Sequence, residues 1–317
     1  MNEIKNFTII IPCIKITDVE NCLTNIRKYY KTVKINVCLN EKVEKSKYDK
    51  NIKFIYTKSE SIGQKRNLAV KAAKTKYLAF IDSDAFPKKN WIESSTKFFK
   101  LKNVGIIAGP NINPKKQNYF ENLIGIIKSS FLITMKPGFQ RGYIKKAQFV
   151  KFLPSVNWIL KKKIFNINGN MNSKMLRNED WDFVYKLRKK KLKVFYSPNT
   201  IVFHKSGTIR HFISKRFKYG YYMWNILNKP NSENYYFYFP MIFCAFLISF
   251  PLIFFFKLYN ILYLSVCVLF LLIVLIEALR IMDKVKNLFY IFVLLIVCTL
   301  SPGFGILSGL IFNFKKT

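Results

Sequence analysis

Two aspartates one residue apart, Asp82 and Asp84, end the apolar run in "YLAFIDSDAFP" at 77–87. Adjacent carboxylates at the end of a buried strand repel each other and lose hydration, and a shared divalent cation offsets that cost. Mg2+ and Mn2+ take oxygen ligands and keep coordination positions free for phosphate oxygens. The triplet therefore predicts a metal site that binds a phosphate-bearing substrate. The alternative is an acidic turn before "PKKNW" that caps the next helix.

A second acidic pair, Glu179 and Asp180, lies in "NEDWDF" at the expected start of a helix. A reaction that transfers a group to a hydroxyl needs a base within hydrogen-bond reach of the proton that is lost, and a carboxylate can be that base. The alternative is a solvated acidic first turn, which the helix dipole favours. The residues of this pair alone leave both interpretations open.

The elements that must position these acids alternate along the chain. Apolar, β-branched runs at 7–13, 33–40 and 52–57 predict strands, and helical spacing appears at 19–30 and 64–74. Strands that alternate with helices predict an α/β fold with a mostly parallel sheet covered by helices on both faces. Ligands of such sheets bind at the carboxyl ends of the strands. Four strand ends are therefore expected to converge on one crevice: Pro12–Cys13, Asn40–Glu41, Ser59–Gly63 and Asp82–Asp84.

Segments in a fixed order resemble family 2 glycosyltransferases of the inverting GT-A type, over residues 7 to about 224. The segments are "TIIIPC", "SIGQKRNLAVKAA", "YLAFIDSDAFP", "FLPSVNWILKKKIFNINGNMN" and "RNEDWDFVYKLRKKKLKVFYSPNTIVFH". The second resembles the family's Gly-x-x-x-Arg-Asn helix start, the third its DxD strand, and the last its Glu-Asp helix followed by a strand that ends in histidine. The resemblance implies a Rossmann-like GT-A domain and a nucleotide-sugar donor.

The resemblance also implies roles for single residues. Asp82 would contact the ribose of the donor, and Asp84 would bind Mn2+ or Mg2+, with His204 near the metal; an ordinary histidine at a strand end is the alternative for His204. Asp180 would be the catalytic base and Glu179 would hold the acceptor, while Asp182 is expected to be structural. The remaining donor-binding residues would be Pro12, Cys13, Glu41, Gly63, Arg66, Asn67 and Ser83.

Two departures from the family pattern limit what the resemblance implies. Relatives usually carry an aspartate that recognises the base after the second strand, whereas this chain has Asn40 and Glu41 there, which leaves the nucleotide open. The Gln-x-x-Arg-Trp signature of processive polysaccharide synthases is missing from "SKRFKYGYYMW". Transfer of a single sugar is therefore expected rather than polymerisation.

The C-terminal part is almost continuously apolar and predicts a membrane domain at 231–317 behind a glycosyltransferase domain at 1–230. Two or three transmembrane segments are expected, at about 235–256, 261–279 and 288–314, each near the length of about 20 residues that crosses a bilayer. The more basic second loop places the preceding domain in the cytosol. "SPGFG" at 301–305 interrupts the third segment and predicts either a kinked span or a re-entrant hairpin. Residues 205–229 resemble a helix at the bilayer surface, or alternatively one packed on the domain.

Composition excludes several other classes. The formal net charge is +36, from 53 Lys and Arg against 17 Asp and Glu, but the lysines are scattered and form no nucleic-acid-binding stripe. Such charge attracts anionic lipids and phosphate-bearing substrates. The six cysteines have no CxxC spacing, which argues against a zinc site or a disulfide framework. "MNEIKN" precedes the first strand without an apolar stretch, so no cleavable signal peptide is expected.

Together these features predict a multi-pass cell-membrane glycosyltransferase of polysaccharide biosynthesis with a cytosolic catalytic domain. It would move one sugar from a nucleotide-sugar to a hydroxyl of a lipid-linked or cell-surface glycan precursor, with membrane lipids as further partners and no nucleic acid. One alternative is a polyprenyl-phosphate glycosyltransferase, whose acceptor is already ionised. Others are a catalytically silent GT-A module for membrane assembly and, with little polar pathway to support it, a transporter.

Overall fold

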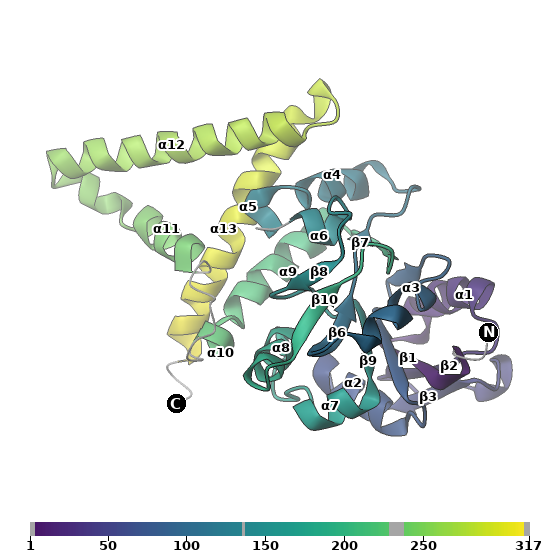
Figure 1. Ribbon diagram of the computed structural model, residues 1–317. Coiled ribbons are helices and arrows are strands. Elements are labelled where there is room, and N and C mark those ends of the chain that lie inside the picture. Colours follow the sequence, from purple (N-terminus) through teal and green to yellow (C-terminus); the bar gives the residue numbers. More distant parts are fainter. Residues whose placement is uncertain (1–3, 135–136, 228–237, 314–317) are drawn as a thin grey trace. The chain divides into compact units, whose positions relative to one another are not determined.

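The computed structural model describes residues 4–134, 137–227 and 238–313 and divides the chain into two compact units (Figure 1). The first, here called the sheet unit, contains Met1–Pro114 and Gly138–Lys205. The second, the helical unit, contains Lys115–Pro137 and Ser206–Thr317. Compactness does not locate a membrane boundary, so the domain boundary expected at 230 stays a prediction.

An eight-stranded sheet with the order β3-β2-β1-β4-β9-β6-β10-β8 forms the centre of the sheet unit. The first four strands in this order are parallel to one another, and so are β6 and β10, whereas β9 and β8 are antiparallel to their neighbours. This arrangement confirms the predicted α/β fold with a mostly parallel sheet. The strands are β1 (Phe7–Pro12), β2 (Lys34–Leu39), β3 (Ile52–Tyr56), β4 (Tyr77–Ile81), β6 (Val104–Ala108), β8 (Gln148–Val150), β9 (Asn157–Lys161) and β10 (Lys193–Tyr196).

Both faces of this sheet are buried. Alternate residues of a strand point to opposite faces, so one strand contributes side chains to two apolar clusters. In β1 the side chains of Phe7, Ile9 and Ile11 belong to one apolar cluster, and that of Ile10 belongs to another. Helix α1 (Glu20–Tyr29) covers the first face, and α2 (Ile62–Ala72), α7 (Lys162–Asn168) and α8 (Glu179–Lys189) cover the second. Short helices α3 (Glu93–Thr96) and α6 (Pro137–Arg141) complete the connections.

A three-stranded sheet lies beyond the end of β4 and brings a distant histidine to the aspartates. Its order is β5-β11-β7, formed by β5 (Ala85–Pro87), β11 (Val202–His204) and β7 (Asn111–Ile112). β11 pairs antiparallel with β5, so that His204 lies opposite Ala85. Stacked rings of Phe86 and Phe203, with centroids 5.3 Å apart, reinforce the pairing.

The helical unit joins a segment from the middle of the chain to the C-terminal helices. In one apolar cluster, Leu123 and Ile127 of the middle segment pack with Val274, Ala278 and Ile291 of the C-terminal helices. The carboxylate of Glu277 also accepts a hydrogen bond of 2.8 Å from the backbone N–H of Phe131. The helices of this unit are α4 (Tyr119–Ile127), α5 (Phe131–Thr134), α9 (Ile209–Tyr221), α10 (Trp224–Leu227), α11 (Tyr238–Ile248), α12 (Lys257–Ile281) and α13 (Leu288–Asn313).

Two stretches of the described chain, α12 and 285–312, are helices long and apolar enough to cross a membrane. α11, in the first of the three predicted segments, is shorter, and 228–237 lie outside the described residues. α13 continues through Pro302 without a break, so the re-entrant hairpin expected as one alternative at "SPGFG" is wrong.

The glycines of this stretch serve helix packing instead. A Cβ atom at Gly305 would lie 2.2 Å from the carbonyl oxygen of Phe217 in α9, and one at Gly309 would lie 2.4 Å from that of Tyr221. Likewise, a Cβ at Gly220 of α9 would lie 2.1 Å from the carbonyl oxygen of Pro302. Glycines permit such close approach of two helix backbones. α9 therefore packs against α13 within the helical unit, and the expected position of 205–229 at the bilayer surface stays a prediction.

Pro302 removes one backbone hydrogen bond from α13, and Arg216 replaces it. Proline has no N–H, so the carbonyl of Cys298, four residues earlier, loses its helical donor. The Nε of Arg216 donates to that carbonyl at 2.5 Å, and its guanidinium also donates to the carbonyl of Ile133 at 3.1 Å. One side chain thus connects α9, α13 and α5.

We expect Arg216→Met to lower the free energy of unfolding in detergent by about 1–3 kcal/mol, because the Cys298 carbonyl stays buried without a donor. In a Pro302→Ala background the restored N–H supplies that bond, so the same substitution should cost less. Arg210→Met, at an exposed position of α9, is the control. Thermal unfolding of the four combinations measures the coupling, and an equal cost in both backgrounds would contradict this account.

Candidate active site

Asp82 and Asp84 after β4 and His204 at the end of β11 form a cluster of three residues that could hold a metal ion. Asp82, Asp84 and His204 each offer one ligand atom, and these atoms lie within 4.8 Å of one another. Nε2 of His204 is 3.1 Å from Oδ1 of Asp84, whose side chain is half exposed. Two carboxylate oxygens and one imidazole nitrogen suit Mn2+ or Mg2+, and the exposed side leaves room for ligand oxygens. The cluster therefore fits the predicted metal group.

Arg66 joins this cluster to the second acidic pair. Its side chain is 2% exposed, and its two terminal nitrogens reach different carboxylates: Nη2 is 2.7 Å from Oδ1 of Asp82, and Nη1 is 2.8 Å from Oε1 of Glu179. Arg66 lies in the first turns of α2, whose N-terminus is capped by Ser61 Oγ accepting from the N–H of Gln64. A buried guanidinium between two carboxylates fixes the distance between them.

The acidic pair occupies the first turn of α8 because the preceding residue turns sharply. Asn178 has φ of 65° in the left-handed region, which asparagine tolerates better than most residues. Glu179 is 5% exposed. The pKa of Glu179 is raised to about 7, because burial first and the charge of Asp180 second raise it more than Arg66 lowers it. Oε1 of Glu179 accepts a hydrogen bond from Arg66. The role of Glu179 in holding the acceptor stays a prediction.

Asp180 is held by the segment that precedes β9. Its Oδ2 accepts hydrogen bonds of 3.3 Å from both the backbone N–H and the hydroxyl of Ser155, and its Oδ1 accepts one of 2.9 Å from the N–H of Trp181. Burial raises the pKa of Asp180, while Arg66 and the two N–H groups lower it. A carboxylate in this setting binds a proton more readily than a free aspartate, as a base requires.

Three of the residues predicted to bind the donor make close contacts or hydrogen bonds within the protein. A Cβ at Gly63 would lie 3.1 Å from the carbonyl oxygen of Asn172 and 3.3 Å from the side chain of Glu179, so this glycine permits the close approach of these two residues. The amide of Asn67 donates to the carbonyl of Met171 at 2.8 Å and accepts from its N–H at 2.9 Å. Glu41 accepts a hydrogen bond from the N–H of Ile16. Their contact with a nucleotide stays a prediction.

Pro12, Cys13 and Ser83 lie at the predicted edge. Pro12 ends β1, and Cys13 follows it, 5% exposed. Burial raises the pKa of the Cys13 thiol to about 12, so it carries no thiolate at neutral pH. Ser83 lies partly buried between the two aspartates. Asp182, expected to be structural, is 1% exposed and pairs with Lys186 at 2.8 Å.

Sequence reasoning missed three features of this edge. Nζ of Lys65 donates to the Cys13 carbonyl at 2.7 Å and to Oδ1 of Asn40 at 2.6 Å, tying the ends of β1 and β2 together. Ser155 holds Asp180. In the sequence, only its place in the family-like segment "FLPSVNWILKKKIFNINGNMN" pointed to it. Next to Asp180, the ring of Trp181 stacks on that of Phe152 with centroids 3.7 Å apart.

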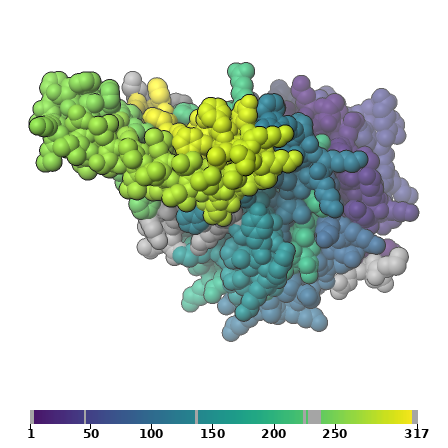
Figure 2. All heavy atoms as spheres, turned by 90° about the horizontal axis from the view of Figure 1, so that it is seen from above, coloured from purple at the N-terminus to yellow at the C-terminus, as the bar shows by residue number. Residues whose placement is uncertain are grey.

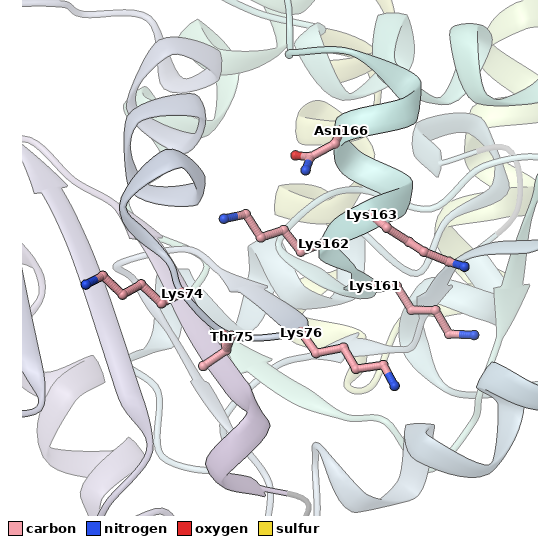
Figure 3. A pocket seen from close by; sticks show the side chains of 7 residues that line it. All are labelled: Lys74, Thr75, Lys76, Lys161, Lys162, Lys163 and Asn166. Atoms are coloured by element: carbon pink, nitrogen blue, oxygen red, sulfur yellow. The ribbon is translucent and has the colours of Figure 1, made fainter.

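A cavity of about 410 Å³ lies at the opposite edge of the sheet and is separate from these residues (Figure 3). It adjoins the start of β4 and the end of the antiparallel β9. Figure 3 shows lysine side chains diverging around it. Its lining residues are Lys74, Thr75, Lys76, Lys161, Lys162, Lys163 and Asn166.

The family model for Glycosyl transferase family 2 matches residues 9–167, just over half of the 317 residues. The chain belongs to glycosyl transferase family 2. The predicted family and its GT-A fold are thereby confirmed. The match includes Arg66, Asp82 and Asp84, while Asp180 and His204 lie beyond its end.

Individual relatives of this family 2 chain are distant. A pre-mycofactocin glycosyltransferase of Mycobacterium tuberculosis (strain ATCC 25618 / H37Rv) is 24% identical over 157 residues, 49% of this chain and 32% of that protein. An uncharacterized glycosyltransferase of Rickettsia bellii (strain RML369-C) is 30% identical over 92 residues, 28% of this chain and 13% of that protein. The chain thus spans a third or less of the length of these relatives. A crystal structure of GalNAc-T7 with UDP, GalNAc and Mn2+ is similar over 64% of this chain and 44% of that chain, with 10% identity and a TM-score of 0.46.

The buried Glu179 predicts a pH dependence of stability. Its pKa is raised from 4.5 to about 7 in the folded protein, so between these values the folded state holds a proton that the unfolded state has released. The contribution of Glu179 to the free energy of unfolding therefore falls as pH rises through this window. We expect Glu179→Gln to show a shallower decline than the wild type in unfolding experiments from pH 4.5 to 7.5.

The matched control is Glu44→Gln, at a fully exposed glutamate whose pKa is lowered by the side chain of Lys47. Its titration lies below the window, so its slope should equal that of the wild type. An unchanged slope in Glu179→Gln would show that Glu179 titrates normally in the folded protein.

Proposed function

We propose that this chain is a membrane-anchored inverting glycosyltransferase that moves a single sugar from a nucleotide-sugar donor to a hydroxyl of a lipid-linked or cell-surface glycan precursor. Membership of family 2 supports sugar transfer. The observation that carries the proposal is the buried Arg66, which joins Asp82 of the metal cluster to Glu179 of the acidic pair. Transfer requires the donor and the base that activates the acceptor to be held at a defined distance from each other.

Each residue of the edge then has a proposed role. Asp84, His204 and Asp82 would hold a divalent cation, which supplies positive charge near the diphosphate of the donor. Asp180 takes the proton from the acceptor hydroxyl while that oxygen forms a bond to the anomeric carbon. The bond between this carbon and the diphosphate oxygen breaks on the opposite face, so the configuration inverts and the nucleoside diphosphate leaves. Ser155 orients Asp180 through its two hydrogen bonds.

The apolar C-terminal helices support anchoring in the cell membrane, with the glycosyltransferase domain at 1–230 and the membrane domain at 231–317. The loop after α12 carries Lys284 and Lys286 against Asp283, a basic excess that favours the cytosolic side. A cytosolic catalytic domain has access to nucleotide-sugars. A lipid-linked acceptor is held at the same surface.

We expect one class of nucleotide-sugar, with Mn2+, to raise the midpoint of thermal unfolding of the detergent-solubilised chain. A ligand at 100 times its Kd stabilises by about 2.7 kcal/mol. The shift should require manganese, disappear in Asp84→Asn and persist in Glu44→Gln. Absence of a shift with every donor would favour the catalytically silent module, and a shift that survives in Asp84→Asn would remove that aspartate from the donor site.

We expect Asp180→Asn to lower transfer to a hydroxyl acceptor by about 10²–10⁴-fold, the usual contribution of a general base, while the donor-dependent thermal shift remains. Ser155→Ala removes one hydrogen bond to Asp180 and should have a smaller effect. The measurement is release of the nucleoside diphosphate in the presence of acceptor. Full activity of Asp180→Asn with a polyprenyl phosphate would contradict the hydroxyl acceptor and favour the polyprenyl-phosphate enzyme.

A further inference from the structure

The two long apolar helices of the helical unit differ in how much of their surface is covered. Only 17% of the most apolar stretch of α12 is buried, against 44% for the segment that contains α13. Figure 2 shows the side chains of α12, in light green, lying open along the viewed face of the helix. From 238 to 276 the sequence has a single charged residue, Lys257, at the start of α12. The surface of α12 is therefore suited to hydrocarbon on most sides.

The C-terminal half of α13, by contrast, packs against α9, which carries several cationic residues. The hydroxyl of Ser301 donates to the carbonyl of Ile213 at 3.1 Å, and the backbones touch where Gly305 and Gly309 meet α9. α9 contains no acidic residue, and its cations are Arg210, Lys215, Arg216 and Lys218. Of these, Arg210 and Lys218 are exposed, as are His211 and Ser214.

A helix with this exposed face does not belong in the hydrocarbon core. Placing Lys or Arg there is costly, and an array of several would be more so. In the headgroup layer the same charges are attracted to anionic lipids. Because α9 and α13 are in backbone contact, residues 298–309 of α13 lie at the same depth as α9.

The N-terminal half of α13 packs on α4, a largely apolar helix with polar residues at its N-terminal end. α4 packs on it through the cluster of Leu123 and Ile291, and the hydroxyl of Tyr119 donates to Oδ1 of Asn287 at 2.8 Å. α4 exposes Asn122, and Asn118 at its cap is exposed too. Neither half of α13 is therefore surrounded by apolar surface alone.

The exposed apolar residues of α13 fall mainly on one stripe. Its large exposed side chains include five at intervals of four and seven residues, which share one face of an α-helix. They are Phe289, Val293, Val297, Phe304 and Ile311. One exposed apolar stripe, with α9 and the polar end of α4 as neighbours, is typical of a helix that lies in the membrane interface, and α11 and α12 pack on the remaining surface of α13.

We infer that α13 does not cross the bilayer but lies along its surface beside α9, whose cationic face contacts anionic headgroups. Only the hairpin of α11, the short helical turn Phe250–Phe254 and α12 enters the hydrocarbon. α12 has 25 residues, about 37 Å at 1.5 Å per residue, which spans a core of about 30 Å. The chain after α13 then lies on the same side as the loop between α12 and α13. The inference rests on the proposed anchoring in the membrane and replaces its third span.

Reporter fusions to the full chain in a bacterial host test this topology. Alkaline phosphatase, which is active only outside the cytosol, and green fluorescent protein, which folds only inside it, are each fused after Thr317 and, separately, inserted after Phe256 at the hairpin tip. We expect the C-terminal pair to give fluorescence without phosphatase activity, and the tip pair to give the reverse.

The outcomes separate this inference from the proposed anchoring. Phosphatase activity at both positions would overturn the surface position of α13 and leave the anchoring intact. Fluorescence at both positions would overturn crossing by the hairpin and the multi-pass anchor with it. Protease removal of a short C-terminal tag in inverted but not right-side-out vesicles should agree with the fusions, and guards against a fusion that misfolds. The donor-dependent thermal shift of the tagged chain reports the catalytic proposal independently.

Discussion

The guanidinium of Arg66 is buried between two carboxylates that come from distant parts of the chain, Asp82 and Glu179. A buried charge must be paired, and two buried carboxylates near each other repel unless a cation lies between them. The end of β4, the start of α8 and the first turns of α2 therefore depend on this one side chain. Arg66 and Glu179 are buried, whereas the side chain of Asp82 is 30% exposed, and burial is the main cause of the raised pKa of Glu179.

Other polar side chains at the same edge also connect the ends of neighbouring strands through hydrogen bonds. Lys65, next to Arg66 in α2, bonds the Cys13 carbonyl after β1 and Asn40 after β2. Where relatives have an aspartate for the base, Asn40 here is occupied by Lys65 and by the carbonyls of Thr57 and Ser59. The departure seen in the sequence is thus a structural tie in the folded chain.

The helical unit combines an apolar side-chain cluster with close packing of two helix backbones. Glycines let α9 and α13 touch, and Arg216 supplies the hydrogen bond that Pro302 removes. Glu277, the acid in the apolar helix α12, accepts bonds from Arg280 and from the N–H of Phe131. Its charge is therefore used to join α12 to the segment from the middle of the chain, which gives the acid a structural role.

The sequence by itself determined the alternating strands and helices, the mostly parallel sheet, the family and the acids at the strand ends. Periodicity reports which faces are apolar and parallel strands carry their carboxyl ends to one edge, whereas the family followed from the resemblance of its motifs. Only the tertiary structure decided that Arg66 meets Glu179, 113 residues away, that Gly63 makes room for Glu179, and that 115–137 join the C-terminal helices. It also decided that "SPGFG" is a helix-packing surface. Local patterns specify that a face is covered or a glycine is needed, but the covering partner depends on contacts between residues far apart in the chain.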